Sequence, residues 1–138
     1  MTTRPLPVPD EVSAPFWAAC AEHVFTLPRC SHCREFSLPP EATCPHCHSA
    51  DPQFSFEPVN GRGKVRTWTV IRQSLLKGFE VPYLLVDVQF DDQPRVRMIA
   101  QLLDGPETPL RAGDLVTVDF EDLAPGVAVP AFRLDRAA

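Results

Sequence analysis

The sequence contains no long apolar run. No segment approaches the roughly 18 consecutive apolar residues that a membrane-spanning helix needs. The first ten residues hold no apolar stretch of the kind that signal peptides carry. We therefore expect a cytoplasmic protein without a membrane partner.

An excess of positive charge is also missing. The chain has 13 lysines and arginines against 18 aspartates and glutamates, which gives a net charge of −5. This balance opposes generic attraction to nucleic acid or to an anionic membrane. Nucleic acid is therefore not the partner that we expect first.

Motifs for independent catalysis are absent as well. The sequence has no G-x-S-x-G, no H-E-x-x-H, no phosphate loop and no dinucleotide fingerprint. Cys20 has no basic residue near it in sequence beyond His23, and a cysteine beside aromatic residues usually packs in a core. We expect no catalytic residue that acts within this chain alone.

Proline, in contrast, is abundant. The 16 prolines among 138 residues are spread along the chain, which disfavours long helices and favours short strands joined by turns. From about Phe54 onward, apolar and polar residues alternate as they do in half-buried strands. Five runs follow this pattern: 65–71, 84–90, 96–102, 116–120 and 127–132. Five strands with no helix between them predict a mainly β fold, an antiparallel barrel of the OB-fold type.

A short amphipathic helix is expected near the N-terminus. Ser13 is the expected N-cap, and Pro15 fits the first turn because its missing N–H costs nothing there. Phe16 and Trp17 begin a series of apolar residues at helical spacing. Two interpretations stay open, since this face can cover the core of its own domain or dock onto a partner protein.

Four of the five cysteines form two pairs. Cys30 and Cys33 are followed, after ten residues, by Cys44 and Cys47, a C-x2-C-x10-C-x2-C pattern. Two such knuckles can face each other around one tetrahedral ion, and four sulfur ligands select zinc or, less often, iron. A closed four-thiolate site leaves no position for substrate, so we predict a structural zinc ion.

Other uses of these residues have to be weighed. A histidine (His32, His46 or His48) can replace one cysteine as a ligand. The run from Cys44 to His48 also fits the C-x-x-C-H pattern of haem attachment, and Cys-Pro-His-Cys is a dithiol oxidant motif. Neither of these two motifs explains the pair at Cys30 and Cys33, and zinc remains the favoured interpretation.

A basic stretch runs from Pro58 to Phe79 without an acidic residue. In a regular strand, alternate residues would line one face, and this face would carry Arg62, Lys64, Arg66, Trp68 and Arg72. Such a row can hold a phosphate-bearing ligand with a stackable ring, such as a nucleotide or coenzyme A. Gly61 and Gly63 would let the backbone turn or approach that ligand closely. The alternative is a solvated face whose charges protect a sheet edge.

The order of these features resembles that of the thiolase-associated zinc-ribbon and OB-fold proteins, known as domain of unknown function family thirty-five. The resemblance rests on the following motifs: Phe16-Trp-Ala-Ala19, the two cysteine pairs, Phe36-x-x-Pro-Pro40, Gly61-Arg-Gly-x-Val-x-Thr-Trp-Thr69, Pro82-Tyr83, Gly113-Asp-x-Val116 and Pro130-x-Phe132. The family's ribbon usually has a glycine near the end of the first knuckle, where this chain has Arg34. The resemblance divides the chain into an extended tail (1–12), a helix (13–27), a rubredoxin-like zinc ribbon (28–54) and an OB-fold (55–134).

The resemblance also implies a function. Family members are accessory subunits of thiolase-like enzymes that act on acyl-CoA compounds, and the partner carries the carbon–carbon bond or acyl-transfer chemistry. It implies Cys30, Cys33, Cys44 and Cys47 as metal ligands, and it suggests that Arg62, Lys64 and Tyr83 face CoA or the partner. Two other functions stay open: a nucleic-acid-binding ribbon and OB module, and a stand-alone binder of acyl-CoA or nucleotides.

Overall fold

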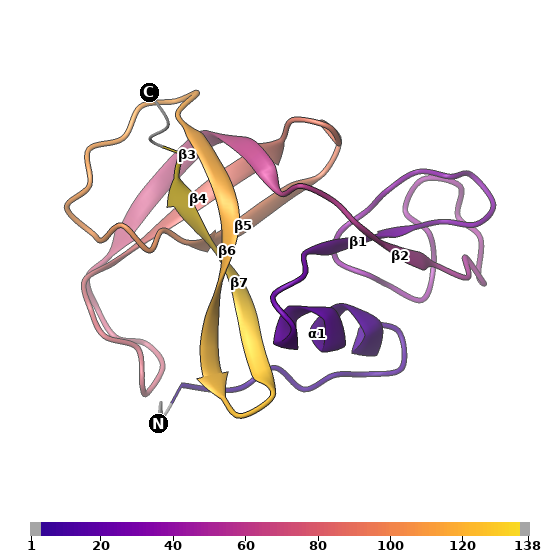
Figure 1. The fold of residues 1–138 in the computed structure, drawn as a ribbon, viewed down its shortest axis with the longest axis horizontal. Coiled ribbons are helices and arrows are strands. Elements are labelled where there is room, and N and C mark those ends of the chain that lie inside the picture. The colour runs from indigo at the N-terminus through magenta and orange to yellow at the C-terminus, as the bar shows by residue number, and fades with distance from the viewer. Residues whose placement is uncertain (1–3, 136–138) are drawn as a thin grey trace.

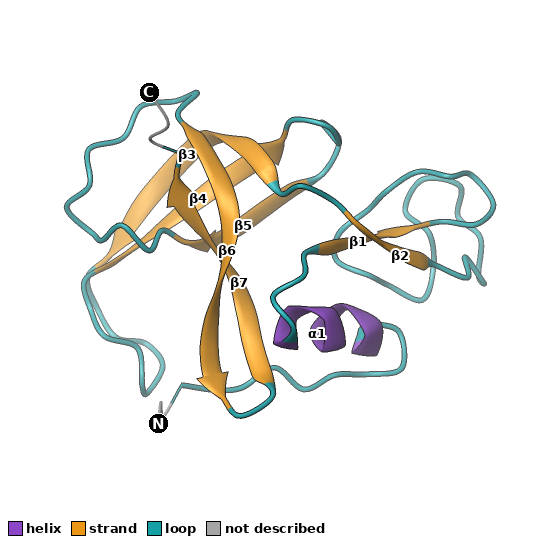
Figure 2. Ribbon diagram, in the orientation of Figure 1, coloured by secondary structure: helices purple, strands orange, loops and turns teal. Residues whose placement is uncertain are grey.

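The computed structural model describes residues 4–135 as one short helix and seven strands (Figures 1 and 2). The first three residues of the expected tail lie outside the described residues. In chain order the elements are α1 (Ala14–Ala21), β1 (Thr26–Arg29), β2 (Ser55–Pro58), β3 (Arg62–Ile71), β4 (Tyr83–Phe90), β5 (Arg97–Gln101), β6 (Leu115–Ala124) and β7 (Val127–Leu134). The mainly β fold with one N-terminal helix is the one that the sequence predicts.

The helix α1 is shorter than the predicted range 13–27. It ends at Ala21 because His23 takes a left-handed backbone conformation, with φ of 60°, and β1 begins three residues later. Pro15 lies in the first turn as expected. Ser13, however, makes no side-chain cap; its Oγ accepts from the backbone N–H of Asp10, whose carboxylate accepts from the Ser13 N–H. The first turn is thus preceded by a closed polar turn.

Two antiparallel sheets form the rest of the fold. Strands β1 and β2 pair with each other, so residues 55–58 lie in the ribbon's sheet and the barrel strands begin at Arg62. The second sheet has the order β5-β4-β3-β6-β7. Its two ends meet where Leu102 forms a parallel bridge with Phe132, and the N–H of Leu103 donates to the Phe132 carbonyl at 2.8 Å. This contact closes the five strands into an OB-fold barrel.

One apolar core joins the helix to the barrel. Alternate residues of the barrel strands point inward, and Val86, Val88, Phe90 and Phe132 have at most 1% of their surface exposed. Phe16 and Cys20 of α1 belong to the same cluster, and α1 packs against β7 and β1 (Figure 1). The helix therefore covers the core of its own domain.

Candidate metal centre and barrel surface

The two cysteine pairs lie on two knuckles of the same shape. In each knuckle, the backbone N–H of the residue after the second cysteine donates to the carbonyl of the first cysteine: Arg34 to Cys30 and His48 to Cys44, both at 2.9 Å. Arg34 and His48 each have φ of 64°, the left-handed region that favours glycine. Arg34 thus adopts a backbone conformation that favours glycine, and the loop closes without a glycine there.

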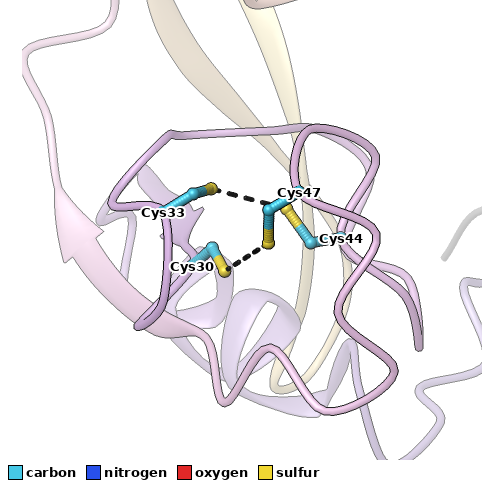
Figure 3. Close-up of side chains that lie close together, drawn as sticks. All are labelled: Cys30, Cys33, Cys44 and Cys47. Carbon is cyan, nitrogen blue, oxygen red and sulfur yellow. Dashed lines mark hydrogen bonds between the residues drawn. The ribbon is translucent and has the colours of Figure 1, made fainter.

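The knuckles bring the four sulfur atoms together (Figure 3). The Sγ atoms of Cys30 and Cys47 lie 3.7 Å apart, as do those of Cys33 and Cys44, and all four sulfurs lie within 4.8 Å of one another. With metal–sulfur bonds of about 2.3 Å, a tetrahedral site has sulfur–sulfur edges of about 3.8 Å. Both of the 3.7 Å sulfur contacts run between knuckles, so the arrangement fits one four-cysteine ion better than an isolated Cys44–Cys47 dithiol.

Local hydrogen bonds favour the thiolate form of Cys44. The backbone N–H of Cys47 is the largest cause that lowers the pKa of Cys44, to about 6, although burial opposes it. The backbone N–H of His46 donates to the Cys44 sulfur at 3.4 Å, and the N–H of His32 donates to Cys30 at the same distance. Such donors stabilise metal-bound thiolates, which supports a structural ion here.

Two of the three knuckle histidines, His32 and His46, have other bonding partners. Nε2 of His32 lies 3.0 Å from the Asp51 carbonyl oxygen, and Nε2 of His46 lies 3.0 Å from that of Phe36. Because a carbonyl only accepts, Nε2 of His46 carries the proton, and Nδ1 accepts from Arg95 at 3.1 Å. Among residues 4–135, the side chains that cluster as a possible metal site are the four cysteines.

Cys20 is set apart from this site. It is fully buried in the apolar core, where burial raises the pKa of its thiol to about 12. The thiol is therefore protonated and packs as a small apolar side chain, as the sequence indicated.

The row of cations on β3 is interrupted. A bulge at Arg66 shifts the register with β4: Val65 lies opposite Val88, but Thr67 lies opposite Asp87. Trp68 consequently lies opposite the buried Val86, on the other face of the strand from Arg62 and Lys64, and 39% of its surface is exposed. The expectation of one continuous row from Arg62 to Arg72 was wrong, because it assumed a regular strand.

Acidic residues of the barrel neutralise part of this row. Nζ of Lys64 lies 2.8 Å from Asp91, and Arg66 lies 3.2 Å from Asp87. Arg62 makes no ion pair within the part of the chain that the structure describes. Of Arg62, Lys64 and Arg66, Arg62 is thus the one without a carboxylate partner among the described residues.

The two glycines beside the row serve packing. A Cβ on Gly63 would lie 2.5 Å from a methyl of Val88 and 2.6 Å from the carbonyl oxygen of Gln89. Gly61, with φ of 72°, would place a Cβ 2.9 Å from Val118. The close backbone approach that the sequence suggested is therefore to neighbouring strands rather than to a ligand.

Tyr83 lies far from Arg62 and Lys64. It begins β4 opposite Ile71, whereas Lys64 lies opposite Gln89 at the other end of the same hairpin. At about 3.4 Å per residue, positions 83 and 89 are roughly 20 Å apart along the strand. The Tyr83 ring stacks on Phe79, with centroids 5.5 Å apart.

The two aromatic residues of α1 have different environments. Phe16 is 5% exposed and lies in the core. Core packing accounts for an apolar residue at this position, and a buried side chain cannot form part of a docking surface. Trp17 packs edge-on against Phe16 and is only partly buried. It lines a shallow apolar hollow together with Pro7, Pro9 and Val127. Only Trp17 of the pair remains open to a partner.

Two family models match the chain in sequence order. Residues 17–53 match the rubredoxin-like zinc ribbon domain of ChsH2, and residues 56–121 match the C-terminal OB-fold domain of ChsH2. The chain therefore carries both ChsH2-type domains, a zinc ribbon followed by an OB-fold. The sequence resemblance to the DUF35 proteins is thereby confirmed, because the relatives of the family carry that name.

The relatives agree with this assignment. A DUF35 domain-containing scaffold protein of Pyrococcus furiosus is 38% identical over 79 residues, and the match covers 55% of this chain and about half, 54%, of that relative. A solved Ltp2-ChsH2(DUF35) aldolase contains a chain that superposes with a TM-score of 0.79 at 25% identity, over 93% of this chain and 98% of that one. A DUF35 protein of unknown function from Sulfolobus solfataricus shares the fold, with a TM-score of 0.60 at 13% identity, over 91% and 86% of the two chains.

No helix among the described residues is both long and apolar enough to cross a membrane.

Proposed function

We propose that this chain is a non-catalytic accessory subunit that binds and completes a thiolase-like enzyme acting on acyl-CoA substrates. The observation that carries the proposal is the match to a chain of an Ltp2-ChsH2(DUF35) aldolase, which spans nearly the full length of both chains. The Pyrococcus relative is described as a scaffold protein, which agrees with a supporting role. The partner supplies the chemistry, and this chain supplies structure.

The metal centre supports a structural role. Four cysteines fill the coordination sphere of one zinc ion, and a closed site of this kind has no open position for water or substrate. Zinc held there would fix the ribbon in shape, since binding of a structural ion is part of folding. A rigid ribbon loses little conformational entropy when a partner protein binds to it.

The outer face of the barrel is where we place contact with CoA. Arg62 is the best candidate for a CoA phosphate, because its charge is not balanced by a carboxylate of the described chain, whereas Asp91 engages Lys64. Tyr83 lies too far along the hairpin to share that phosphate with Arg62. We assign Tyr83 to a different part of the CoA channel or to the partner.

The alternative is a nucleic-acid-binding module. It would use the same barrel face, but two cations of the row are already paired with carboxylates, and the chain carries a net charge of −5. Binding to nucleic acid depends on uncompensated lysines and arginines and weakens steeply with salt. These features favour the subunit over the nucleic-acid module.

A pull-down from the native host at moderate salt tests the proposal. A tagged chain should retain one thiolase-like protein in near-stoichiometric amount, identified by mass spectrometry, and the purified pair should act on an acyl-CoA. Retention of nucleic acid in place of an enzyme would favour the alternative. Binding of CoA by the isolated chain in isothermal titration would indicate a stand-alone binder.

Charge reversal tests the CoA-facing residues. Arg62→Glu should raise the KM of the complex for its acyl-CoA about tenfold while the two chains still co-purify, because a cation next to a phosphate is replaced by an anion. Arg111→Glu, at another exposed arginine, is the matched control and should leave KM unchanged. If the two variants change KM equally, the outer face does not contact CoA as proposed.

A further inference from the structure

In the loop that joins β3 to β4, residues 72–82, three large apolar side chains are exposed to solvent. Leu75 is 81% exposed, Leu76 56% and Val81 37%. The loop projects from the end of the barrel opposite the zinc ribbon, next to the N-terminal segment (Figure 1). Exposed leucines that lie together on a loop mark a surface for binding rather than for packing within the chain.

Internal contacts hold this loop in shape. Oγ of Ser74 donates to the Leu76 carbonyl at 3.0 Å, within the turn that presents the two leucines. At the base of the loop, Phe79 stacks on Tyr83, and the guanidinium of Arg4 lies 4.5 Å from the centre of the Phe79 ring. Phe79 is thus held by the chain itself, while the leucines remain outside. A loop ordered before binding loses little conformational entropy when a partner covers it.

The net charge of the loop is opposite in sign to the net charge of the whole chain. Arg72 and Lys77 are exposed and make no ion pair with any residue from 4 to 135, and Glu80 is the one acid between positions 72 and 82. The loop therefore carries +1 on a chain of −5. A surface complementary to it has an apolar centre and a rim of carboxylates.

We propose that the β3–β4 loop docks into an apolar groove rimmed by carboxylates on the partner enzyme, with Leu75 and Leu76 in the groove and Arg72 and Lys77 at its rim. This inference rests on the proposed function, because it takes the enzyme chain as the occupant. A second copy of this chain fits less well, since a two-fold contact would set the same net-positive loop against itself.

The test uses the enzyme chain identified in the pull-down, purified and titrated with the zinc-loaded subunit. Leu75→Ser/Leu76→Ser should weaken binding about 100-fold, because both apolar side chains leave the groove. Arg72→Glu/Lys77→Glu should weaken it about tenfold at low salt, and added salt should reduce the difference from wild type. Zinc content and melting temperature should stay at the wild-type values in both variants.

The matched control removes two exposed apolar side chains elsewhere on the barrel. Ile99→Thr/Leu115→Thr alters residues that are 66% and 48% exposed and should leave binding within twofold of wild type. Equal affinity of the loop variants and wild type would overturn the docking surface while the subunit function stands. If wild type binds no enzyme chain, the proposed function fails, and the docking surface fails with it.

Light scattering and vesicles address the other occupants. The isolated wild-type chain should be monomeric, and it should not bind vesicles of phosphatidylglycerol and phosphatidylcholine. A dimer that Leu75→Ser/Leu76→Ser dissociates would assign the loop to a second copy and overturn the inference. If wild type binds vesicles and Leu75→Ser/Leu76→Ser does not, the loop binds a lipid surface, and the inference is likewise overturned.

Discussion

Between positions 28 and 54 the chain buries no valine, leucine, isoleucine or phenylalanine, whereas the five barrel strands bury eight of them: Val65, Leu84, Val86, Val88, Phe90, Val116, Leu123 and Phe132. The buried residues between these positions are two cysteines, two prolines and a serine: Pro28, Cys30, Ser37, Cys44 and Pro52. Apolar burial stabilises the barrel at roughly 25 cal/mol per Å². The ribbon has less of that source of stability, since its Phe36 and Leu38 are only partly buried against the core, and we expect it to depend more on bonds between the four sulfurs and a metal ion. The two regions should therefore respond in opposite ways to metal removal and to changes in packing.

Loss of a metal ligand should have the largest effect. Cys44→Ser should release the metal and unfold the ribbon, because a structural zinc ion contributes on the order of 10 kcal/mol of folding free energy. Elemental analysis measures the metal, and amide hydrogen exchange over 28–54 measures the ribbon. The barrel amides should stay protected.

A buried cysteine outside the site provides the control for this change. Cys20→Ala should keep one metal ion per chain, because Cys20 lies in the apolar core and contacts no ligand. A Cys44→Ser protein that still binds one ion, or a metal-free ribbon with protected amides, would contradict the dependence on metal.

A packing change in the barrel should have the next largest effect. Gly63→Ala should lower the free energy of unfolding by about 3 kcal/mol, because its Cβ would collide with Val88 and with a backbone carbonyl that cannot move freely. Urea unfolding followed by tryptophan fluorescence measures it, and metal content should not change. Gly105→Ala, where nothing lies within 4 Å of the added Cβ, should cost about 1 kcal/mol from backbone strain.

A glycine in the second knuckle should strengthen the ribbon alone. His48→Gly should relieve about 1 kcal/mol of strain at φ of 64° and raise metal affinity roughly fivefold, as measured by competition with a chelator. His48→Ala keeps a Cβ and should give no such gain. Equal affinities of the glycine and alanine variants would show that the histidine side chain, and not the backbone, sets the affinity.

The smallest expected effect is at the contact between the two regions. Arg95, next to β5, lies 3.6 Å from Glu35 and 3.1 Å from His46, both in the ribbon. Because Arg95 is largely exposed, Arg95→Ala should lower the free energy of unfolding by only about 0.5 kcal/mol. A double-mutant cycle with Glu35→Gln measures the coupling. A coupling well above 1 kcal/mol would mean that the ribbon and barrel do not act as separate regions.

The two regions also differ in what the sequence could predict. The metal site could be predicted residue by residue, because cysteine spacing within a knuckle leaves few geometries. The barrel strands could be placed from their period of two, but the facing of β3 beyond Arg66 could not. A bulge adds one residue and inverts the later side chains, and no residue type marks it reliably.

Long-range contacts set the remaining limits. The helix ends early because the chain must turn at His23 into β1, and that requirement comes from the partner strand rather than from helix propensity. Ion pairs such as Lys64 with Asp91 join residues far apart in sequence, so the basic stretch looked more highly charged than it is. Phe16 could be assigned to the core only once β7 was in place beside the helix.

The packing of α1 on β7 also bears on how the chain is made. The helix leaves the ribosome well before β7, the strand that covers it, because the whole ribbon and the other barrel strands lie between them in sequence. During synthesis, Phe16 and Trp17 are made before β7, against which the helix packs. The cysteine knuckles are complete once Cys47 has been added, so they can bind an ion before β7 is made. The helix is therefore translated before the ribbon but reaches its final packing after it.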